Sequence, residues 1–272
     1  MNYPDILTTA SAIAEEAGRI IAARFGQTNH EQYKGAVDPV TEADLASEAH
    51  ILARLKEAYP EHLILAEESG GSNWQTQAPL WLIDPLDGTV NFAHHFPHFC
   101  VSLALVVEGE IQLGVTHDPL RRETFAALRG HGATCNGQPI QVGQRPRLAD
   151  ALLVTGFPYD RRTAFDNNTQ RVDPFLRRSQ GLRRTGSACL DLAYIAAGRL
   201  DGYWEIRLKP WDVAAGILLV REAGGVCTDF AGHAETARLL SGAEIVASNG
   251  RFHHEMLRVL QMGNGAPLPE PG

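Results

Sequence analysis

One segment of the chain reads Leu80-Trp-Leu-Ile-Asp-Pro-Leu-Asp-Gly-Thr89, an apolar run that leads into two carboxylates. The run predicts a buried strand, and Pro85 predicts its end because proline cannot donate to a sheet ladder. Asp84 and Asp87 then lie together and repel each other unless a cation stands between them. Mg²⁺ prefers such oxygen ligands, and N–H groups after the turn at Gly88 suit a phosphate. The alternative is an ordinary turn, since Asp, Pro and Gly are common turn formers.

Three more acids stand beside predicted apolar elements. Glu67 follows an apolar run at 63–66, and it reaches the same sheet edge as Asp84 if both runs are strands of one sheet. Asp44 lies near the start of an amphipathic stretch at 45–58. Asp212 opens an apolar helix at 213–223.

Each of these acids also has an ordinary explanation. Helix capping accounts for Thr41 best, and it accounts for Asp44 and Asp212 taken singly, while Glu67 alone reads as solvated surface. Together, however, the acids would destabilise a fold that brought them close, because like charges in a partly dry site cost several kilocalories. The set therefore favours a cation site over separate caps and turns.

Four segments occur in a familiar order and spacing: Asp38-Pro-Val-Thr-Glu-Ala-Asp44, Glu67-Glu-Ser69, Trp81-Leu-Ile-Asp-Pro-Leu-Asp-Gly-Thr-Val-Asn-Phe92 and Trp211-Asp-Val-Ala-Ala-Gly216. With them the chain, up to about Arg258, resembles the inositol monophosphatases of the lithium-sensitive, Mg²⁺-dependent phosphatase superfamily. Arg184-Thr-Gly-Ser-Ala188 and Leu208-Lys-Pro-Trp-Asp212 are most similar to the bacterial inositol-1-monophosphatase branch. The resemblance implies a mixed α/β fold, a layered α-β-α-β-α sandwich, with the site between two halves at 1–145 and 146–262.

The resemblance also implies roles for individual residues. The ligands of two or three Mg²⁺ ions would be Glu67, Asp84, the Leu86 carbonyl, Asp87 and Asp212, with help from Thr89. The catalytic residues would be Thr89 and Asp44, which orient and deprotonate a water, and Glu67, which orients another. The substrate would contact Leu86, Asp87, Gly88, Thr89, Arg183, Gly186, Ser187, Ala188, Glu205 and Asp212. Arg183 alternatively lies at a subunit interface or in a solvated basic patch with Arg184, and Lys34 matches a loop lysine near the site.

The activity implied is Mg²⁺-dependent hydrolysis of myo-inositol monophosphate to inositol and phosphate, in a homodimer. The same chemistry on fructose-1,6-bisphosphate, histidinol phosphate or a nucleotide 3′-phosphate is an alternative. A regulatory partner of the transcription machinery is an alternative from another class. A haloacid-dehalogenase-type phosphatase fits less well, because Asp84 and Asp87 are three apart with a proline between them and no later G-D-x-x-x-D follows.

Composition agrees with a globular enzyme. The net charge of −8 argues against general nucleic-acid binding. No apolar run approaches a membrane span and no signal-peptide pattern opens the chain, so we expect a cytoplasmic protein without a membrane partner. Four scattered cysteines without C-x-x-C spacing predict free thiols. His94, His95 and His98 favour packing and surface roles over a zinc site, and Trp81, Trp204 and Trp211 are expected in or beside the core.

The remaining pattern predicts alternating short elements. We expect a first helix at 5–25 capped by Asp5, a loop containing Lys34 and Gly35, and antiparallel strands at 99–128 with a hairpin at Gly109. Residues 145–150 are a plausible junction between the halves. Beyond them the expected strands are 152–154, 202–206 and 244–247, the expected helices are 168–179, 187–197 and one from Phe252, and the tail 263–272 is expected to be disordered.

Overall fold

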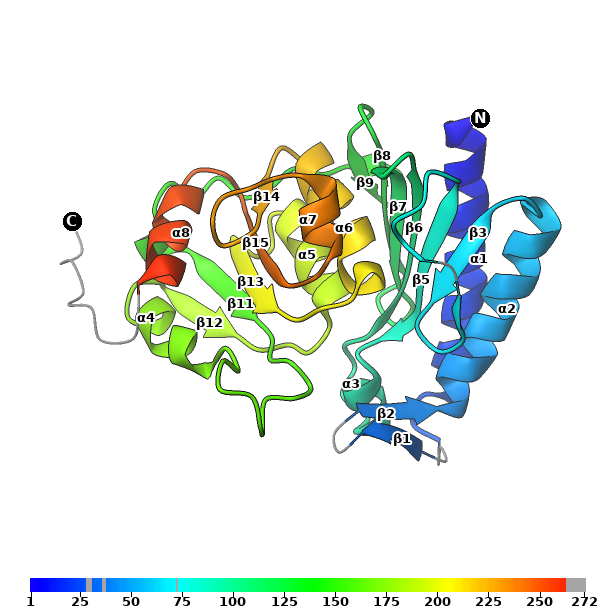
Figure 1. Ribbon diagram of the computed structural model, residues 1–272, viewed down its shortest axis with the longest axis horizontal. Coiled ribbons are helices and arrows are strands. Elements are labelled where there is room, and N and C mark those ends of the chain that lie inside the picture. The colour runs from blue at the N-terminus through cyan, green and yellow to red at the C-terminus, as the bar shows by residue number, and fades with distance from the viewer. Residues whose placement is uncertain (28–30, 36–37, 72, 263–272) are drawn as a thin grey trace.

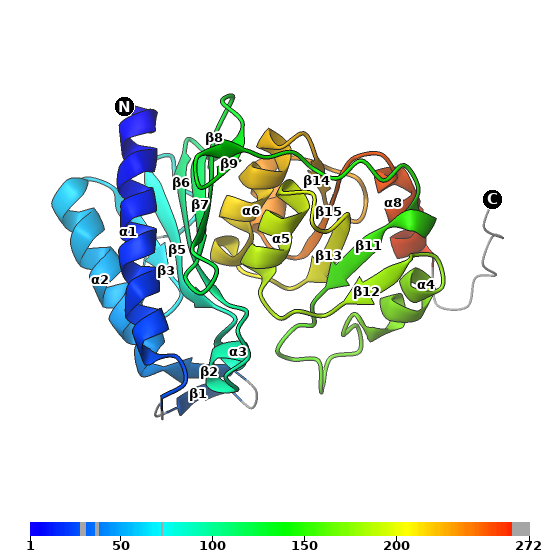
Figure 2. The same cartoon turned by 180° about the vertical axis from the view of Figure 1, so that it is seen from behind.

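Helices and sheets alternate in five layers along the molecule (Figure 1). The computed structural model describes residues 1–27, 31–35, 38–71 and 73–262, and for 31–35 and 38–39 it describes the backbone alone. Two helices, an eight-stranded sheet, two helices, a five-stranded sheet and a last helical layer follow one another, and Figure 2 shows the same order from behind. The predicted α-β-α-β-α sandwich is confirmed. The predicted division at 145 stays a prediction, and the tail 263–272 lies outside the described residues.

The first layer consists of α1 (Tyr3–Arg24) and α2 (Glu42–Ala58), which pack on each other and on the eight-stranded sheet. The prediction that Asp5 caps α1 is wrong, because the helix begins earlier and Asn2 occupies the N-cap. Pro4 explains the earlier start, since proline is favoured in the first turn, where its missing N–H has no partner to lose. Thr41 caps α2 as predicted, and its hydroxyl accepts the Ala43 N–H.

The eight-stranded sheet runs in the order β10 (Gln138–Pro139), β9 (Ala133–Cys135), β8 (Glu123–Leu128), β7 (Glu110–Asp118), β6 (Cys100–Val107), β5 (Leu80–Asp87), β3 (Leu63–Ala66) and β4 (Gly70–Gly71). Strands β3 and β5 are parallel, and Ala66 is the register partner of Ile83, so Glu67, which follows β3, and Asp84, which lies within β5, reach the same end of the sheet. The hairpin between β6 and β7 turns at Gly109 as predicted, with φ +77°.

Strand β5 does not end at Pro85, so that prediction is wrong. The register against β6 shifts between Asp84 and Asp87, a β-bulge that removes Pro85 from the ladder. A proline is tolerated there because no ladder hydrogen bond is asked of it. The bulge carries the strand past Asp84 and presents Asp87 further along the same edge.

The five-stranded sheet runs in the order β12 (Gly181–Arg183), β11 (Leu152–Thr155), β13 (Gly202–Ile206), β15 (Glu244–Ser248) and β14 (Val226–Thr228). Between the sheets lie α5 (Ala188–Ala196) and α6 (Pro210–Glu222), as the figures show. The outer layer holds α4 (Val172–Leu176) and α8 (His253–Gln261), and α7 (Thr236–Leu240) packs beside α6. The predicted helix at 168–179 is too long, because a 3₁₀ turn at Thr169–Arg171 precedes α4 and the chain then enters β12.

The segment predicted as a loop around Lys34 is a short antiparallel hairpin, β1 (Glu31–Gly35) with β2 (Asp38–Thr41). It lies beside α3 (Thr89–Ala93) at the end of the first sheet. The side chain of Lys34 lies outside the described residues, so its predicted place near the site is not tested.

Apolar side chains fill three cores, one between the first helices and their sheet, one around α5 and α6, and one under α8. Trp81 and Trp204 are fully buried, and Trp211 is half-buried against the central core, as predicted. All four cysteines are free. None of the described helices combines the length and apolar character needed to cross a lipid bilayer.

Candidate active site

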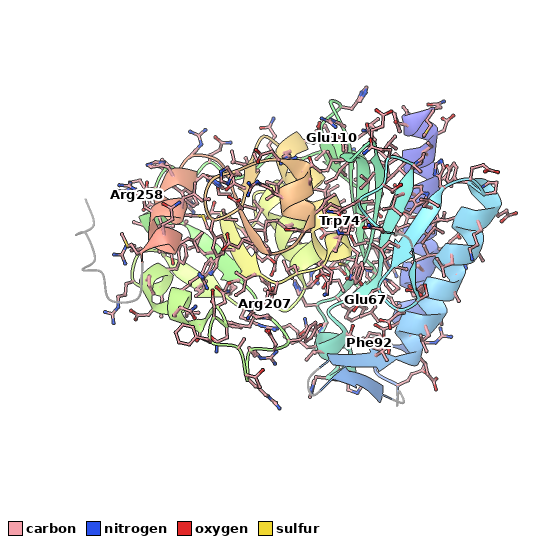
Figure 3. All side chains as sticks on the ribbon, in the orientation of Figure 1. Glu67, Trp74, Phe92, Glu110, Arg207 and Arg258 are labelled. Atoms are coloured by element: carbon pink, nitrogen blue, oxygen red, sulfur yellow. The ribbon has the colours of Figure 1, made fainter. Side chains whose placement is uncertain are left out.

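A cavity of about 360 Å³ is lined by segments of both sheets and of the helices between them. It collects the ends of β3 and β5, the start of α3, the loop after β11, the segment before α5 and the connection from β13 to α6. Figure 3 shows Glu67 on the side of the eight-stranded sheet and Arg207 on the side of the five-stranded sheet. Four of the predicted ligands meet in this cavity, and we call them the acidic wall: Glu67, Asp84, Asp87 and Asp212.

Asp84 lies in an unfavourable electrostatic position within the acidic wall. Its side chain is 2% exposed, and one carboxylate oxygen accepts the Leu86 N–H at 3.1 Å. Burial raises its pKa well above the usual value, and the charges of Glu67, Asp87 and Asp212 raise the pKa further. A carboxylate in this position is stabilised by a cation or carries a proton.

Asp87 joins β5 of the eight-stranded sheet to the beginning of α5. Its Oδ2 accepts the Ser187 hydroxyl at 2.6 Å and the Cys189 N–H at 2.7 Å, both from the beginning of α5. Ser187 is also the N-cap of that helix, and its hydroxyl accepts the Leu190 N–H. Burial raises the pKa of Asp87, and these hydrogen bonds oppose the rise. The beginning of α5 therefore fixes the orientation of the Asp87 carboxylate.

Asp212 does not cap α6, so that interpretation is wrong. The helix begins at Pro210 after the N-cap Lys209, and Asp212 is the third residue of the helix, where its carboxylate accepts the Lys209 N–H at 2.7 Å. Burial raises the pKa of Asp212 well above its usual value, and the charge of Glu67 adds to the rise. One oxygen thus fixes the helix start while the residue lines the cavity.

Thr89 and Asp44 form the hydrogen-bonded pair that the resemblance implies. The Thr89 hydroxyl lies 3.1 Å from Asp44 Oδ1 and 3.0 Å from the Leu86 carbonyl, and it can donate to either. The other oxygen of Asp44 accepts the N–H and hydroxyl of Thr41. Asp44 is fully buried, and burial raises its pKa. It therefore both completes the cap of α2 and faces Thr89, a double use that capping alone did not reveal.

Glu48 is a positioning residue that the sequence did not indicate. It lies on α2, is 4% exposed, and its two carboxylate oxygens accept the N–H groups of Glu68 and Ser69, each at 2.9 Å. The loop that carries Glu67 is thereby held against α2. No periodicity distinguishes such a glutamate from a solvated one on a helix.

Gly88 lets the chain turn sharply behind the acidic wall. Its φ is +95°, and a β-carbon there would stand 3.0 Å from the His98 carbonyl. Both facts require glycine. The turn places Thr89 at the first position of α3 and leaves Leu86, Gly88 and Thr89 in the cavity lining.

Glu205 lies on the opposite side of the cavity, at the end of β13. It is 7% exposed, accepts the Tyr203 hydroxyl at 2.7 Å, and its pKa is raised to about 7 by burial. Gly156 lies directly against it, since a β-carbon at that position would come within 2.1 Å of Oε2. A glycine at 156 therefore lets the Glu205 carboxylate keep this position, and a side chain there would displace it.

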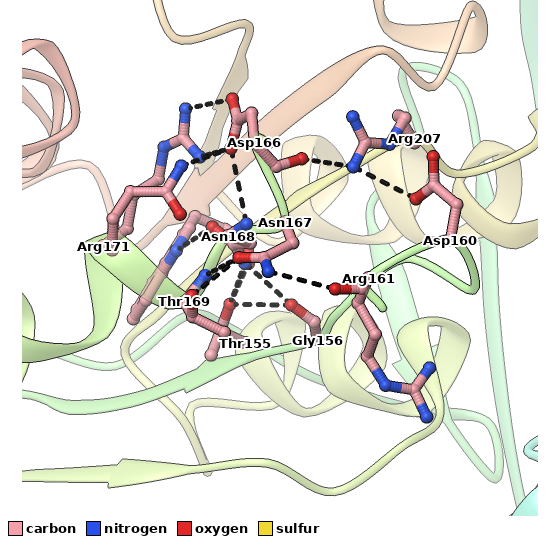
Figure 4. Close-up of polar contacts among 12 residues, drawn as sticks. Thr155, Gly156, Asp160, Arg161, Asp166, Asn167, Asn168, Thr169, Arg171 and Arg207 are labelled. Atoms are coloured by element: carbon pink, nitrogen blue, oxygen red, sulfur yellow. Dashed lines mark hydrogen bonds and ion pairs between the residues drawn. The ribbon is translucent and has the colours of Figure 1, made fainter. Parts of the chain in front are cut away.

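The loop after β11 is held by its own polar network (Figure 4). We call residues 156–171 the 156–171 loop. The buried Asn168 donates to Thr155 Oγ1 at 3.0 Å and to the Gly156 carbonyl at 2.7 Å, and it accepts the Trp204 indole N–H at 3.0 Å. Asn168 adopts φ +70°, a conformation that asparagine tolerates better than most residues. The first residues of this loop line the cavity.

Two arginines pair with the acids of this loop: Arg207 from beyond β13, and Arg171 at the end of the loop, where α4 begins. Arg207, which follows β13, contacts the Asp166 carbonyl and lies 3.1 Å from the Asp160 carboxylate. Arg171 pairs with the Asp166 carboxylate, which lowers the pKa of Asp166 to about 2. Each acid of the loop thus has an arginine partner.

The predicted substrate residues divide into two groups. Gly186, Ser187, Ala188 and Glu205 line the cavity together with Leu86, Asp87, Gly88, Thr89 and Asp212. Arg183 is exposed on the edge strand β12 and is absent from the described lining, whereas its neighbour Arg184 belongs to it. Sequence reasoning missed Asp191, Arg161 and Lys209 in the lining, because nothing in their local pattern separates them from helix or surface residues.

The three histidines near α3 take different positions. His94 and His95 are exposed, whereas His98 is buried and lies 4.0 Å from the Asp191 carboxylate. Burial lowers the pKa of His98 to about 4. Within the described ranges the one grouping of potential ligand atoms is Asp87, Cys100 and Cys189, which contains no histidine. The expected packing and surface roles agree with these positions.

The donor set of the acidic wall fits Mg²⁺ ions. Its side chains supply carboxylate oxygens alone, which is the ligand type that hard divalent cations select. The Leu86 carbonyl lies among them in the lining. The raised pKa of Asp84 and of Asp212 shows that the folded chain opposes their ionisation unless a cation is bound.

Comparison with known proteins points the same way. The chain matches the Inositol monophosphatase family over residues 2–262. An inositol-1-monophosphatase of Synechocystis sp. is 46% identical over 263 residues, which cover 94% of this chain and 90% of that protein. The protein named Nus factor SuhB of Escherichia coli K12 is 43% identical over 254 residues, covering 93% and 94%. The structure of an inositol monophosphatase from Anabaena superposes with a TM-score of 0.87 at 42% identity, covering 97% of this chain and 99% of that one.

Proposed function

The chain belongs to the inositol monophosphatase family, and from this premise we propose that it is a Mg²⁺-dependent phosphomonoesterase that hydrolyses myo-inositol monophosphate. The observation that carries the proposal is the acidic wall. Its four carboxylates come from β5, α6 and the loop after β3, and they line one cavity although folding them together is unfavourable without a cation.

The acidic wall and the Leu86 carbonyl would hold the metal ions. When bound, Mg²⁺ would supply an activated water and neutralise charge on the phosphate and the leaving oxygen. The chain's own part is to keep these donors in place without metal. Ser187 and the Cys189 N–H fix Asp87, and the Lys209 N–H fixes Asp212.

Thr89 and Asp44 would handle the proton of the attacking water. The Thr89 hydroxyl can accept a proton from water on one side while it donates to Asp44 at 3.1 Å on the other. Because burial raises the pKa of Asp44, this carboxylate accepts a proton more readily than an ordinary aspartate. The pair is suited to general-base assistance for this reason.

Glu205 and the segment 186–188 would recognise the polyol. Glu205 is held by Tyr203 and lines the cavity away from the acidic wall, where a hydroxyl of the substrate can reach it. The N–H groups of Gly88 and Thr89 would contact the phosphate. Phosphate and polyol would then be bound by different parts of one cavity.

A phosphate-release screen tests the proposal. The compounds are myo-inositol 1-phosphate, fructose-1,6-bisphosphate, histidinol phosphate and adenosine 3′-phosphate, each with Mg²⁺ and with EDTA. We expect the inositol ester to be hydrolysed with the highest kcat/KM, and every rate to vanish in EDTA and return with Mg²⁺. Li⁺ should inhibit by occupying the second metal position. Full activity of metal-free protein would refute the mechanism, and a better substrate among the others would replace inositol phosphate alone.

The similarity to proteins named Nus factor SuhB supports a second role as a partner of the transcription machinery. The two roles are compatible, since partner binding needs a surface and not the cavity. Affinity capture with the tagged chain, from its own cell extract, should then retain RNA polymerase subunits. The Asp84→Asn variant should retain them equally if the two roles are separate.

We also propose a cytoplasmic homodimer in which Arg183 and Arg184 lie at or near the interface. Both arginines are exposed at the edge of the five-stranded sheet, and arginine is frequent in interface centres. Light scattering should give twice the chain mass for the wild type and a shift toward monomer for the Arg183→Glu/Arg184→Glu variant. A monomeric wild type at micromolar concentration would refute the dimer.

A further inference from the structure

Two cysteines lie behind the acidic wall and face the same carboxylate. The ligand atoms of Asp87, Cys100 and Cys189 all lie within 4.8 Å of one another. Cys100 and Cys189 are fully buried, whereas Asp87 and Ser187 line the cavity. The two thiols therefore sit beneath the cavity floor, and Asp87 stands between them and the cavity.

Backbone structure fixes this arrangement. Cys100 begins β6 and is the register partner of Asp87 across the β5–β6 ladder, with its sulfur 3.9 Å from Asp87 Oδ2. Cys189 is in the first turn of α5, and its N–H donates to the same oxygen at 2.7 Å. Two different elements thus place the two sulfurs within 4.8 Å of one carboxylate, and the Cys189 sulfur also lies 3.2 Å from the Asp212 carbonyl.

A fourth donor completes the group. The Ser187 hydroxyl lies 2.6 Å from Asp87 Oδ2 and 3.7 Å from the Cys100 sulfur. The sulfur–oxygen distances of 3.9 and 3.7 Å are close to the edges, roughly 3.3–3.8 Å, of a tetrahedral site with bonds of about 2.0–2.3 Å, and the Ser187 and Asp87 oxygens would move apart to reach it. Mg²⁺ does not select sulfur, whereas Zn²⁺ and Cd²⁺ do.

We propose that Asp87, Cys100 and Cys189, with Ser187 as the fourth donor, form a binding site for a thiophilic divalent cation such as Zn²⁺ or Cd²⁺ beneath the cavity floor. Binding converts both thiols to thiolates, so two protons are released to water for each ion bound. The ion takes Asp87 Oδ2, and Asp87 is also a donor of the acidic wall. An ion at the thiol site therefore opposes, through like charge and a shared carboxylate, a Mg²⁺ ion at a position that uses Asp87.

Ultraviolet spectroscopy with Cd²⁺ on the reduced, metal-free protein tests the site without any measurement of turnover. Cd²⁺ bound to thiolates gives a charge-transfer absorption, and Cd²⁺ bound to carboxylates alone does not. We expect one absorbing Cd²⁺ per chain, about half of that intensity in Cys100→Ala or Cys189→Ala, and none in the double variant. Circular dichroism verifies that each variant is folded. The matched controls are Cys135→Ala and Cys227→Ala, which should leave the absorption unchanged.

Competition gives a second readout. Because Asp87 is shared, saturating Mg²⁺ should weaken the apparent Cd²⁺ affinity at least about tenfold in the wild type. Asp87→Asn should bind Cd²⁺ more weakly and lose that dependence on Mg²⁺. Absorption that persists in the Cys100→Ala/Cys189→Ala variant, or that disappears in the Cys135→Ala or Cys227→Ala control, would overturn the proposal. Either result would leave the proposed phosphatase activity untouched.

Discussion

Asp84 and Asp166 are the same side chain in two opposite electrostatic environments near one cavity. Asp84 belongs to the acidic wall, where burial and the charges of Glu67, Asp87 and Asp212 raise its pKa well above the usual value. Asp166 belongs to the 156–171 loop, where Arg171 lowers its pKa to about 2. The acids of the loop pair with Arg171 and Arg207 (Figure 4), whereas Asp84 and Asp212 of the acidic wall are each destabilised as anions by burial and by neighbouring carboxylates.

This difference distinguishes charges that stabilise the fold by themselves from charges that need a bound cation. An ion pair such as Asp166 with Arg171 is complete within the chain and asks for no ligand. A group of buried, mutually repelling carboxylates lowers the stability of the fold, and it persists where binding of a cation offsets that cost. The acidic wall is therefore expected to respond to Mg²⁺, and the loop is not.

The largest effect should come from removing the charge of Asp84 in the acidic wall. Asp84→Asn keeps the shape but removes the charge of a proposed metal donor, so turnover should fall at least about a hundredfold at saturating Mg²⁺. The metal-free variant should unfold at a higher temperature than the metal-free wild type, because repulsion is relieved. Phosphate release and thermal unfolding in EDTA measure the two quantities.

Asp166→Asn is the matched control for that experiment. It removes a favourable pair with Arg171, so it should lower the unfolding temperature modestly with and without Mg²⁺. Its turnover should remain within a few-fold of wild type. Near-normal turnover of Asp84→Asn, or equal responses of both variants to Mg²⁺, would contradict the distinction between the two regions.

The dependence of stability on pH should differ in sign between the two regions. A carboxyl with a raised folded-state pKa contributes stability below its unfolded value of about 3.8, and this is lost as pH rises. In EDTA, the stability of Asp84→Asn relative to wild type should therefore grow as pH rises above about 4. Asp166, with a pKa of about 2, contributes stability above 3.8 that is lost as pH falls towards 2.

Urea unfolding at several pH values measures both trends. The deficit of Asp166→Asn should shrink as pH falls from about 4 towards 2. With saturating Mg²⁺, the advantage of Asp84→Asn at neutral pH should reverse, because the wild type gains binding energy that the variant lacks. A stability difference between Asp84→Asn and wild type that does not change with pH in EDTA would mean that neither burial nor the neighbouring acids raise the pKa of Asp84 in the folded chain.

The acidic wall was predictable from sequence and the loop was not, for a physical reason. Asp84 and Glu67 each end an apolar run, and a run predicts a buried strand whose end is a sheet edge. The resemblance joined them to Asp44 and Asp212, which alone read as caps. Asn168 acts through buried hydrogen bonds to residues distant in sequence, and such contacts leave no periodic signal.

The elements of the fold also differed in how well the sequence predicted them. Long elements such as α1 and the β6–β7 hairpin followed from periodicity and a turn glycine. The β5 bulge did not, because Pro85 ends a regular ladder but is compatible with a bulge. The hairpin of β1 and β2 was missed because its short strands carry little apolar alternation.

An intermediate effect is expected at Glu205, which lines the same cavity as the acidic wall and lies against Gly156 of the 156–171 loop. Glu205→Gln should reduce kcat/KM for myo-inositol 1-phosphate about ten- to a hundredfold, the equivalent of one charge-assisted hydrogen bond. Glycerol 2-phosphate has no ring and fewer hydroxyls, so its kcat/KM should fall less. Equal losses on both substrates would assign Glu205 to the metal or the fold. Tyr203→Phe, which removes the donor to Glu205 but keeps the carboxylate, should have a smaller effect with the same substrate preference.

The smallest effect concerns Arg207, which joins the 156–171 loop to β13. Arg207 adopts φ +58°, which costs a non-glycine residue about 1 kcal/mol, and its guanidinium contacts Asp160 and the Asp166 carbonyl. Arg207→Gly removes the strain and the contacts together, so global stability should change by less than about 1 kcal/mol. Arg207→Ala keeps the strain and loses the contacts, so it should be the less stable of the two variants.

Loop opening should still increase in both variants, because it depends on the contacts and not on the strain. Trypsin can cleave after Arg161 and Arg162 in the loop, and cleavage there should be several-fold faster in Arg207→Gly and Arg207→Ala than in wild type. KM should rise modestly while kcat stays similar, since the loop lines the cavity but supplies none of the acidic wall. An unchanged cleavage rate in both variants would show that the contacts of Arg207 with Asp160 and Asp166 do not limit opening of the 156–171 loop.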